Sequence, residues 1–377
     1  MSIENSITLT KKVGFYYPSR QLGGAEILIV RYFNFLKENG IEVFIITENS
    51  AEIYFSLIND SRDIILAKDF QWFSIQENWT IIIPVPLCFH RELNKYFHGA
   101  TLIAWVLHPG LITSQISRRF LISYLSELRL RALVKSLIKS NSLWYLDYEC
   151  YNQTAEVLKL NNIVPSLMPL LLDENHIPRI NQNKRENISL AFVQRAVKPK
   201  LVSVELLLNQ ITQSYSDRTK KLDIHFIGDG VQEIISKDYS EYFNNVYFHS
   251  AMTNNDLRDF MNRNIDITVA MGQTALDAAY SGNVSILTDL VVHEFDEKDF
   301  KFNFIYENNL SLGGFYNNKL YSEKSNDIHK LLELIENPTM LAKQKRLSQE
   351  FVVSHYMKSN DKLINLINSI EKASYKI

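Results

Sequence analysis

The sequence predicts an α/β protein built from two parallel-sheet domains that face each other. Short apolar segments of strand length alternate with segments of helical periodicity along most of the chain, a pattern typical of βαβ units. The pattern runs twice, and a polar segment without periodicity, 173–187, separates the two sets as a linker. With 377 residues, the chain is long enough for two domains of about 150 residues each.

The first domain, 1–172, opens with a βαβ unit. An apolar strand segment at 13–19 leads through a Gly-Gly break into a helix over 25–39, whose apolar residues recur at helical spacing. Gly40 stands where a C-cap glycine belongs, and a β-branched strand follows at 41–47. Further strands are predicted at 64–67, 80–85, 101–108, 142–147 and 164–172.

The second domain, 188–342, repeats the alternation. Its strands are predicted at 188–193, 222–230, 246–250, 265–270 and 284–289. Its helices are predicted near 200–214, 255–264, 274–281 and 326–336. The last segment, 343–377, is amphipathic and helical, and we expect it to cross back and pack toward the first domain.

Composition excludes several classes of protein. Hydrophobic residues make up 46% of the chain, which is too much apolar material for an intrinsically disordered protein. Basic and acidic residues nearly balance, 40 against 42, so we expect no nucleic-acid partner. Cys88 and Cys150 are too few for a disulfide framework, and no cysteine–histidine cluster suggests zinc. The N-terminus lacks a secretory signal and the apolar run 80–89 is too short to span a membrane, so we expect a cytoplasmic protein.

Gly23 and Gly24 lie between the first predicted strand and the first predicted helix. A glycine pair at this place lets backbone N–H groups approach an anion at the positive end of the helix. A tight turn without a ligand explains the pair equally well. The third glycine of a dinucleotide-binding fingerprint is absent, which disfavours a nicotinamide cofactor.

Arg195 and Lys200 follow the first strand of the second domain, five residues apart in a loop that contains a proline. Two cations on a strand-to-helix connection suit a diphosphate, because each charge-assisted hydrogen bond contributes about 1.5–3 kcal/mol. A solvated basic loop is the plainer interpretation.

A third candidate is the segment from Gly272 to Asp277. Gly272 follows a strand, and the helix after it offers the backbone of Gln273 and Thr274 to ligand phosphates. Asp277 then accepts a hydrogen bond from a ribose hydroxyl. The alternative is structural: Thr274 caps the helix, and Asp277 completes a capping box.

In their order along the chain, these segments resemble the glycosyltransferases of the GT-B fold. The resemblance is nearest to the retaining enzymes of glycosyltransferase family 4 and to related transferases of bacterial surface polysaccharides. It covers residues 13 to 290 and is carried by QLGGAE (21–26), Arg195 with Lys200, IGDG (227–230), and a Gly-x-Thr-x-x-x-Asp helix followed by SGNVSILTD (281–289).

The resemblance implies two Rossmann-like domains on either side of a cleft, with the acceptor bound by the first and a nucleotide-sugar donor by the second. It implies that the Gly23-Gly24 loop approaches the donor phosphates, that Arg195 and Lys200 neutralise the leaving diphosphate, and that Asp277 holds the ribose. Gly228, Gly272, Gln273 and Thr274 complete the implied donor site. Because cations and helix termini stabilise the diphosphate electrostatically, we expect neither a metal nor a cofactor.

His108 ends the predicted strand 101–108 and precedes Pro109 and Gly110. The resemblance implies that this histidine faces the reacting sugar, and strand ends are where α/β sheets bind ligands in general. A surface or capping histidine is the alternative.

The function implied is transfer of a sugar from a nucleotide-sugar donor to a glycan or lipid-linked acceptor, in bacterial lipopolysaccharide, O-antigen or capsule biosynthesis. A nucleotide-sugar epimerase on the same fold is one alternative. Another is a non-catalytic scaffold, because Val269 occupies the position of the first acid in the family's Glu-x7-Glu pair.

The segment 118–139 carries six cations and one anion. Basic helices dock proteins on anionic membranes at about 1 kcal/mol per suitably placed cation. We therefore expect Arg118 and Arg119 to contact the inner face of the plasma membrane. The charges are not cleanly separated from the leucines on a helical wheel, so a partly buried helix with a solvated rim is an equal alternative.

Overall fold

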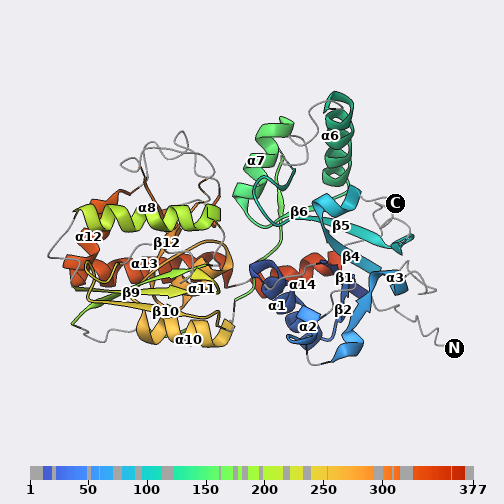
Figure 1. Cartoon of the computed structure of the whole chain (residues 1–377). Coiled ribbons are helices and arrows are strands. Elements are labelled where there is room, and N and C mark those ends of the chain that lie inside the picture. The colour runs from blue at the N-terminus through green and yellow to red at the C-terminus, as the bar shows by residue number, and fades with distance from the viewer. Residues whose placement is uncertain are drawn as a thin grey trace. The chain divides into compact units, whose positions relative to one another are not determined.

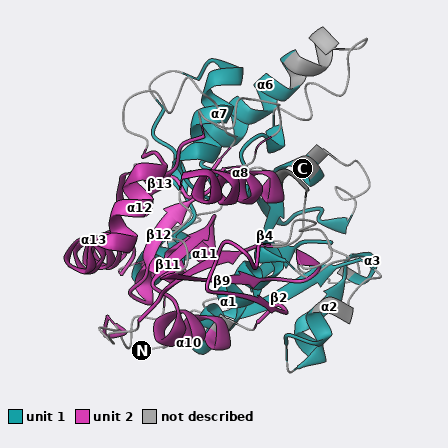
Figure 2. Cartoon of the chain, turned by 60° about the vertical axis from the view of Figure 1, so that its left-hand side comes forward, with its two compact units in different colours: residues 1–171, 360–377 teal, residues 172–359 magenta. Residues whose placement is uncertain are grey.

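The computed structural model of the chain divides into two compact units (Figure 2). Unit 1 combines residues 1–171 with 360–377, and unit 2 comprises residues 172–359. The structure describes residues 12–18, 23–48, 52–58, 60–70, 79–89, 96–112, 123–160, 163–172, 177–180, 186–194, 198–214, 221–231, 239–252, 254–289, 291, 300–307, 310–314, 326–357 and 359–369.

Unit 1 is built on a parallel sheet of seven described strands (Figure 1). They are β1 (Lys12–Tyr16), β2 (Glu42–Thr47), β3 (Ile64–Leu66), β4 (Trp79–Pro84), β5 (Thr101–Val106), β6 (Leu143–Tyr145) and β7 (Ser166–Leu167). Their order is β3-β2-β1-β4-β5-β6-β7, so the winding direction reverses between β1 and β4. Sheets of this kind bind ligands beside the carboxyl ends of the strands at that switch point.

The described helices of unit 1 are α1 (Gly24–Glu38), α2 (Glu52–Phe55), α3 (Ala67–Phe70), α6 (Ser123–Lys139), α7 (Tyr148–Leu158) and α14 (Ser359–Ser369). No helix was predicted over α7. Its start is fixed by Asp147, whose Oδ1 accepts the N–H of Cys150 at 2.9 Å. A side-chain cap of this kind is worth about 1 kcal/mol, enough to help a short helix form.

Unit 2 repeats the architecture with a six-stranded sheet. Its strands are β8 (Ile188–Val193), β9 (Leu222–Ile227), β10 (Asn245–His249), β11 (Ile267–Ala270), β12 (Val284–Leu287) and β13 (Asn303–Phe304). The order is β10-β9-β8-β11-β12-β13, with only the edge strand β13 antiparallel among these strands. The switch point of this sheet lies between β8 and β11.

Helices cover both faces of this second sheet (Figure 1). They are α8 (Lys198–Ser214), α10 (Asn254–Asn264), α11 (Gln273–Tyr280), α12 (Ile328–Glu336) and α13 (Pro338–Tyr356). Helix α11 is buried along its length from Ala275 to Tyr280, and its alanines let it pack closely on α13 and β12. The predicted architecture, two α/β units on parallel sheets, is confirmed.

The C-terminal helices divide between the units. Helix α13 packs on α11 and β12 within unit 2, and residues 360–377 are grouped with unit 1. Asn337 starts α13 earlier than the predicted 343, because its Oδ1 accepts the N–H of Met340 at 3.0 Å.

Residues 178–180 of the predicted linker belong to unit 2 and pack against its helices. Gln349 Nε2 of α13 donates to Pro178 O at 2.8 Å. The backbone of Ile180 runs so close to Gly282 that a Cβ at that glycine would lie 3.1 Å from the Ile180 Cα. Gly282 also has a φ of 85°, so the turn between α11 and β12 requires glycine on both counts.

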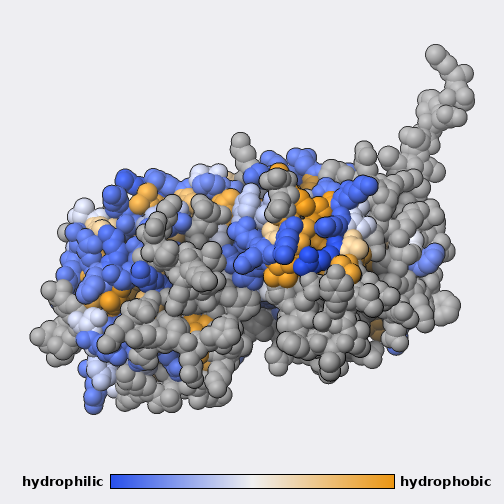
Figure 3. Space-filling view, turned by 90° about the horizontal axis from the view of Figure 1, so that it is seen from above, coloured by the Kyte–Doolittle hydropathy of each residue, from blue (hydrophilic) through white to orange (hydrophobic). Residues whose placement is uncertain are grey.

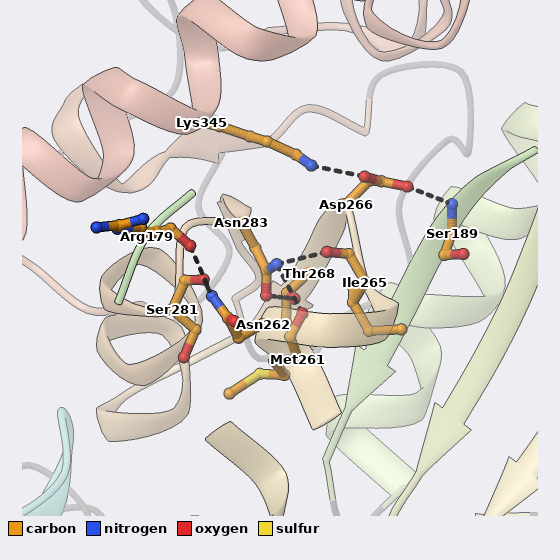
Figure 4. A network of polar contacts seen from close by, with 10 residues as sticks. All are labelled: Arg179, Ser189, Met261, Asn262, Ile265, Asp266, Thr268, Ser281, Asn283 and Lys345. Carbon is orange, nitrogen blue, oxygen red and sulfur yellow. Dashed lines mark hydrogen bonds and ion pairs between the residues drawn. The ribbon is translucent and has the colours of Figure 1, made fainter. Parts of the chain in front are cut away.

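A buried ion pair closes the amino end of the unit 2 sheet (Figure 4). The Lys345 ammonium of α13 lies 2.6 Å from Asp266 Oδ1, and their side chains are 7% and 16% exposed. Asp266 Oδ2 accepts the N–H of Ser189 at 3.0 Å. Because Asp266 precedes β11 and Ser189 belongs to β8, the pair joins α13 to two neighbouring strands.

Asn283, just before β12, occupies the same amino end (Figure 4). Its Nδ2 donates to Met261 O at 3.0 Å and to Ile265 O at 2.6 Å. Its Oδ1 accepts from Thr268 Oγ1 at 3.2 Å. One buried side chain therefore holds the end of α10 against β11 and β12, as buried amides must be hydrogen-bonded.

None of the described helices is long and apolar enough to cross a bilayer.

Candidate functional site

The carboxyl end of the unit 2 sheet carries the N-terminus of α11. Gly272 follows β11 as the N-cap, with a φ of 64° that favours glycine. Its N–H donates to Leu312 O at 2.7 Å, and no side chain caps the helix. The first N–H groups of an α-helix have no partner within the helix. They lie here at the switch point between β8 and β11, where an anion is best stabilised.

Asp277 lies one turn into α11 and is 3% exposed. Because the helix begins at Gln273, Thr274 is its second residue, and the alternative in which Thr274 caps the helix is wrong. Gln273 Nε2 donates to Asp277 Oδ1 across a long 3.4 Å. Helical side chains lean toward the N-terminus, so the Asp277 carboxylate is held back toward the start of α11.

Lys200 stands in the first turn of α8, across the switch point from α11. Two side chains hold its backbone carbonyl: Gln194 Nε2 donates at 3.3 Å and Ser203 Oγ donates at 2.9 Å. The backbone that carries this cation is therefore held from the residue that follows β8 and from α8 itself. Arg195, its predicted partner, lies outside the described residues.

A glycine-containing segment, 310–314, lies against the ends of β11 and β12. The N–H of Gly314 donates to Asp289 Oδ1 at 2.6 Å, and Asp289 is 5% exposed. Gly313 has a φ of 106°, and a Cβ there would lie 2.7 Å from Thr288 O. Both the backbone conformation and the available space therefore require glycine at this position.

Gly228 directly follows β9 and has a φ of 145°. Its N–H donates to His249 O, at the end of β10, at 3.0 Å. The N–H of Ala251 donates to Asp229 Oδ1 at 2.9 Å, which joins the two strand ends. Gly228 thus lies on the same carboxyl edge as the starts of α8 and α11, because these strands are parallel.

In unit 1, Gly23 is the N-cap of α1 and Gly24 is its first residue. Gly23 is extended, with a φ of −158°, a conformation that any residue adopts. A Cβ at Gly24 would meet no atom within 4 Å. Glycine is about 1 kcal/mol less favourable than alanine in a helix. Neither the backbone nor packing therefore explains why Gly24 is glycine.

The chain between β1 and α1 is held by Tyr54 of α2. The Tyr54 hydroxyl donates to Tyr17 O at 3.1 Å, and Tyr54 is fully buried. Burial, and after it the Glu26 carboxylate of α1, raises the pKa of Tyr54 above its ordinary value, so this hydroxyl stays protonated and remains a donor. The start of α1 is thereby tied to the neighbouring helix.

His108 lies two residues beyond β5 and is exposed. Its carbonyl accepts the N–H of Leu111 at 3.3 Å, which closes a turn through Gly110 at a φ of 78°. It therefore stands at the strand-end position predicted for it, on the carboxyl edge of the unit 1 sheet.

The basic stretch is helical over α6, and Arg118 and Arg119 lie outside the described residues. The Arg131 guanidinium donates to Val157 O of α7 at 3.4 Å, so this cation contributes to packing within unit 1. Lys135 and Lys139 are exposed, and Leu128 is 45% exposed. The face that includes α6 and α7 accordingly mixes hydrophilic and hydrophobic residues (Figure 3).

Three residues of the unit 2 site were not predicted: Ser203, Asp289 and Gly313. The pair Gly313-Gly314 is the second of two adjacent glycine pairs in the chain, a signal that was available. Asp289 is the last residue of the SGNVSILTD segment, but no role was predicted for it, and Ser203 gave no signal, because the importance of both lies in a contact between distant segments. Within the described ranges, no three His, Cys, Asp or Glu side chains gather so as to hold a metal ion.

No protein-family model and no curated protein matches the sequence. Solved structures do match the fold along nearly the whole chain. One is a point mutant of S. aureus TarM in complex with fondaparinux, α-GlcNAc-glycerol and UDP, at 12% identity and a TM-score of 0.63, covering 95% of this chain and all of that one.

A second is the pneumococcal O-GlcNAc transferase GtfA in complex with UDP and GlcNAc, at 9% identity and a TM-score of 0.61, covering 96% of this chain and 99% of that one. A third is a glycosyltransferase from Rickettsia africae, at 11% identity and a TM-score of 0.60, covering 97% of this chain and all of that one. The two units, their strand orders and these similarities agree: the chain has the GT-B fold, as the sequence resemblance predicted.

Proposed function

We propose that this chain is a glycosyltransferase that moves a sugar from a nucleotide-sugar donor to a glycan or lipid-linked acceptor. The observation that carries the proposal is the N-terminus of α11, which lacks a side-chain cap at the unit 2 switch point and has the buried Asp277 one turn behind it. UDP is the first nucleotide to test, because the TarM and GtfA structures similar to this chain contain it.

The proposed role of unit 2 is to bind the diphosphate of the donor. Negative charge builds on the diphosphate as the bond to the sugar breaks, so cations and N–H dipoles stabilise the transition state more than the ground state. We assign this role to Lys200, Arg195 and the first turn of α11, and Asp277 accepts a hydrogen bond from the ribose. We propose that the reaction needs no metal ion.

The proposed role of unit 1 is to bind the acceptor and complete the donor site. Gly24 supports this role, because open space at its Cβ position leaves glycine without a packing reason. A missing side chain at a helix N-terminus lets a ligand phosphate approach the backbone. His108 is proposed to face the reacting sugar from the end of β5.

The test is turnover of a panel of UDP-sugars by the full chain, with and without lipid-linked acceptors, analysed by mass spectrometry. We expect transfer that depends on the acceptor and persists in EDTA. Conversion of donor to an epimer without acceptor would instead favour an epimerase, and failure of every nucleotide-sugar to react or bind would favour a scaffold. Arg195→Ala is expected to lose about 10²-fold in turnover if its charge stabilises the leaving group.

The proposed setting is bacterial lipopolysaccharide, O-antigen or capsule biosynthesis at the inner face of the plasma membrane. The exposed Lys135 and Lys139 on α6, together with Arg118 and Arg119, supply the proposed membrane contact. Co-sedimentation with anionic vesicles at low salt and release at high salt is expected, because salt screens such attraction. Arg118→Glu with Arg119→Glu should weaken it. Equal sedimentation with neutral vesicles would contradict the electrostatic contact.

A further inference from the structure

Ser203 lies between the first turn of α8 and the loop that follows β12 in unit 2. Its side chain is 1% exposed on α8. Its Oγ lies 2.9 Å from Lys200 O, in the first turn of the same helix, and 2.9 Å from Asp289 O, beyond the end of β12. Both carbonyls lie within hydrogen-bond distance of the hydroxyl, and its single proton is shared between them or donated to one at a time, so this one group lies between the start of α8 and the end of β12.

From Asp289 the hydrogen bonds continue to α11. Asp289 Oδ1 accepts the N–H of Gly314 at 2.6 Å, and two residues earlier Leu312 O accepts the N–H of Gly272 at 2.7 Å. Gly313, between them, has no room for a side chain and fits closely against Thr288 O. A short, closely packed path therefore runs from the first turn of α8 to the N-cap of α11.

The path joins two elements that both suit a phosphate group. The first turn of α8 carries the cation Lys200, and the N-terminus of α11 offers backbone N–H groups. In general, a lysine ammonium attracts a phosphate group as a point charge, and a helix N-terminus attracts one through its dipole. They bind both phosphates of a diphosphate together only when their separation matches the ligand, and binding groups need to be placed within about 0.5 Å.

We infer that Ser203 and Asp289 are positioning residues that set the separation of these two phosphate-binding elements and so make the site selective for a nucleoside diphosphate over a monophosphate. The inference rests on the proposed function. Neither residue needs to touch the ligand. Ser203 acts through the backbone of Lys200, and Asp289 acts through the segment 312–314 that holds Gly272.

The test is calorimetric titration of the full chain with UDP and with UMP, for the wild type, Ser203→Ala, Lys200→Ala and the double variant. Ser203→Ala removes one hydroxyl from a buried site and leaves no large cavity. We expect it to weaken UDP binding by about tenfold, equivalent to 1.4 kcal/mol. UMP affinity should change by less than about twofold, the usual scatter between independent sites.

The double variant separates positioning from general damage. If Ser203 acts through Lys200, then Ser203→Ala has little further effect on UDP affinity once the ammonium is gone. Ser348→Ala is the matched control, because Ser348 is also fully buried in unit 2 but its Oγ accepts the N–H of Ser285 in β12. It should lower the melting temperature and leave both affinities unchanged.

Asp289 gives a second, independent arm. Asp289→Asn keeps an oxygen that can accept the Gly314 N–H, so it should retain the preference for UDP over UMP. Asp289→Ala has no such oxygen and should reduce that preference about tenfold. Unchanged UDP affinity in Ser203→Ala would overturn the inference, as would equal losses for UDP and UMP or the same loss in the Lys200→Ala background. Failure of the wild type to bind UDP or UMP would contradict the proposed function first and this inference with it.

Discussion

The two ends of the unit 2 sheet are both rich in polar groups, and they use them differently. At the amino end, Lys345 pairs with Asp266, and Asn283 bonds two carbonyls and a hydroxyl. At the carboxyl end, α11 starts at a glycine without a side-chain cap, and Asp277 is buried one turn further on.

The difference separates polar groups that build the fold from those that serve a ligand. At the amino end, the described side chains bond to one another and to nearby backbone groups, and these bonds tie α13 and the end of α10 to neighbouring strands of the sheet. At the carboxyl end, the bonds hold the backbone of the first turn of α8 and of segment 310–314, as Ser203 holds Lys200 O and Asp289 holds Gly314 N–H. Substitutions at the first end should therefore change stability, and those at the second should change ligand binding.

The largest effect is expected for Lys345→Ala. Removing one partner of a buried ion pair leaves Asp266 uncompensated, a change that costs about 3–5 kcal/mol. Urea denaturation should show a loss of this size, while UDP affinity of the folded fraction stays unchanged. The double variant Lys345→Met with Asp266→Leu should recover most of the stability, because neither charge is then buried. A stable Lys345→Ala protein with weakened UDP binding would reverse the assignment of the two ends.

Asp277→Asn should show the opposite signature. Loss of a charged acceptor for the ribose is expected to weaken UDP binding by about 1.5–3 kcal/mol, whereas the free energy of unfolding should change by about 1 kcal/mol or less. Asn283→Ala is the matched control at the other end of the sheet and should lower stability without changing UDP affinity. Calorimetry with UDP and urea denaturation measure the two quantities, and wild-type affinity in Asp277→Asn would contradict the ligand assignment.

The smallest effect concerns the pH dependence of stability. His249 ends β10, its Nε2 lies 3.1 Å from His225 Nδ1, and Tyr247 and Phe260 contact the pair. Burial lowers the pKa of His249 below its ordinary value of 6.5. The unfolded chain therefore binds the proton more readily than the folded chain does. The contribution of neutral His249 to the free energy of unfolding is complete above pH 6.5 and is lost as the pH falls through the folded pKa.

Melting temperatures between about pH 7.5 and pH 5.5 measure this dependence. Wild type should lose more stability across that range than His249→Gln, which has no proton to bind there. The double variant Lys345→Met with Asp266→Leu should keep the wild-type pH dependence, because it removes both charges of the amino-end pair and leaves His249 in place. Parallel curves for wild type and His249→Gln would show that His249 does not contribute.

Local patterns were enough to predict most of the secondary structure and the helix start that forms part of the candidate site. The start of α11 was predicted correctly within one residue, because an apolar strand, a glycine and a helical pattern follow one another directly. That one residue still mattered: with Gly272 as the N-cap, Thr274 cannot be the cap. Helix α7 escaped prediction because it is short and polar, although Asp147 was a readable cap.

Contacts between distant segments could not be predicted in this way. Ser203 and Asp289 are 86 residues apart, and Lys345 and Asp266 are 79 apart. Such pairs depend on which strands become neighbours and on which helix covers them, and no local periodicity encodes either. The tight fit of Gly313 against Thr288 O has the same origin, because it needs the chain to return across β12.

Hydrogen–deuterium exchange with and without UDP tests the contrast between the two ends most directly. Backbone amides at the start of α11, in the first turn of α8 and in segment 310–314 should gain protection when UDP binds. Amides around Asp266, Asn283 and Lys345, at the amino end of the same sheet, should exchange as before. Protection confined to the amino end, or no change at the carboxyl end when UDP is bound, would contradict the account.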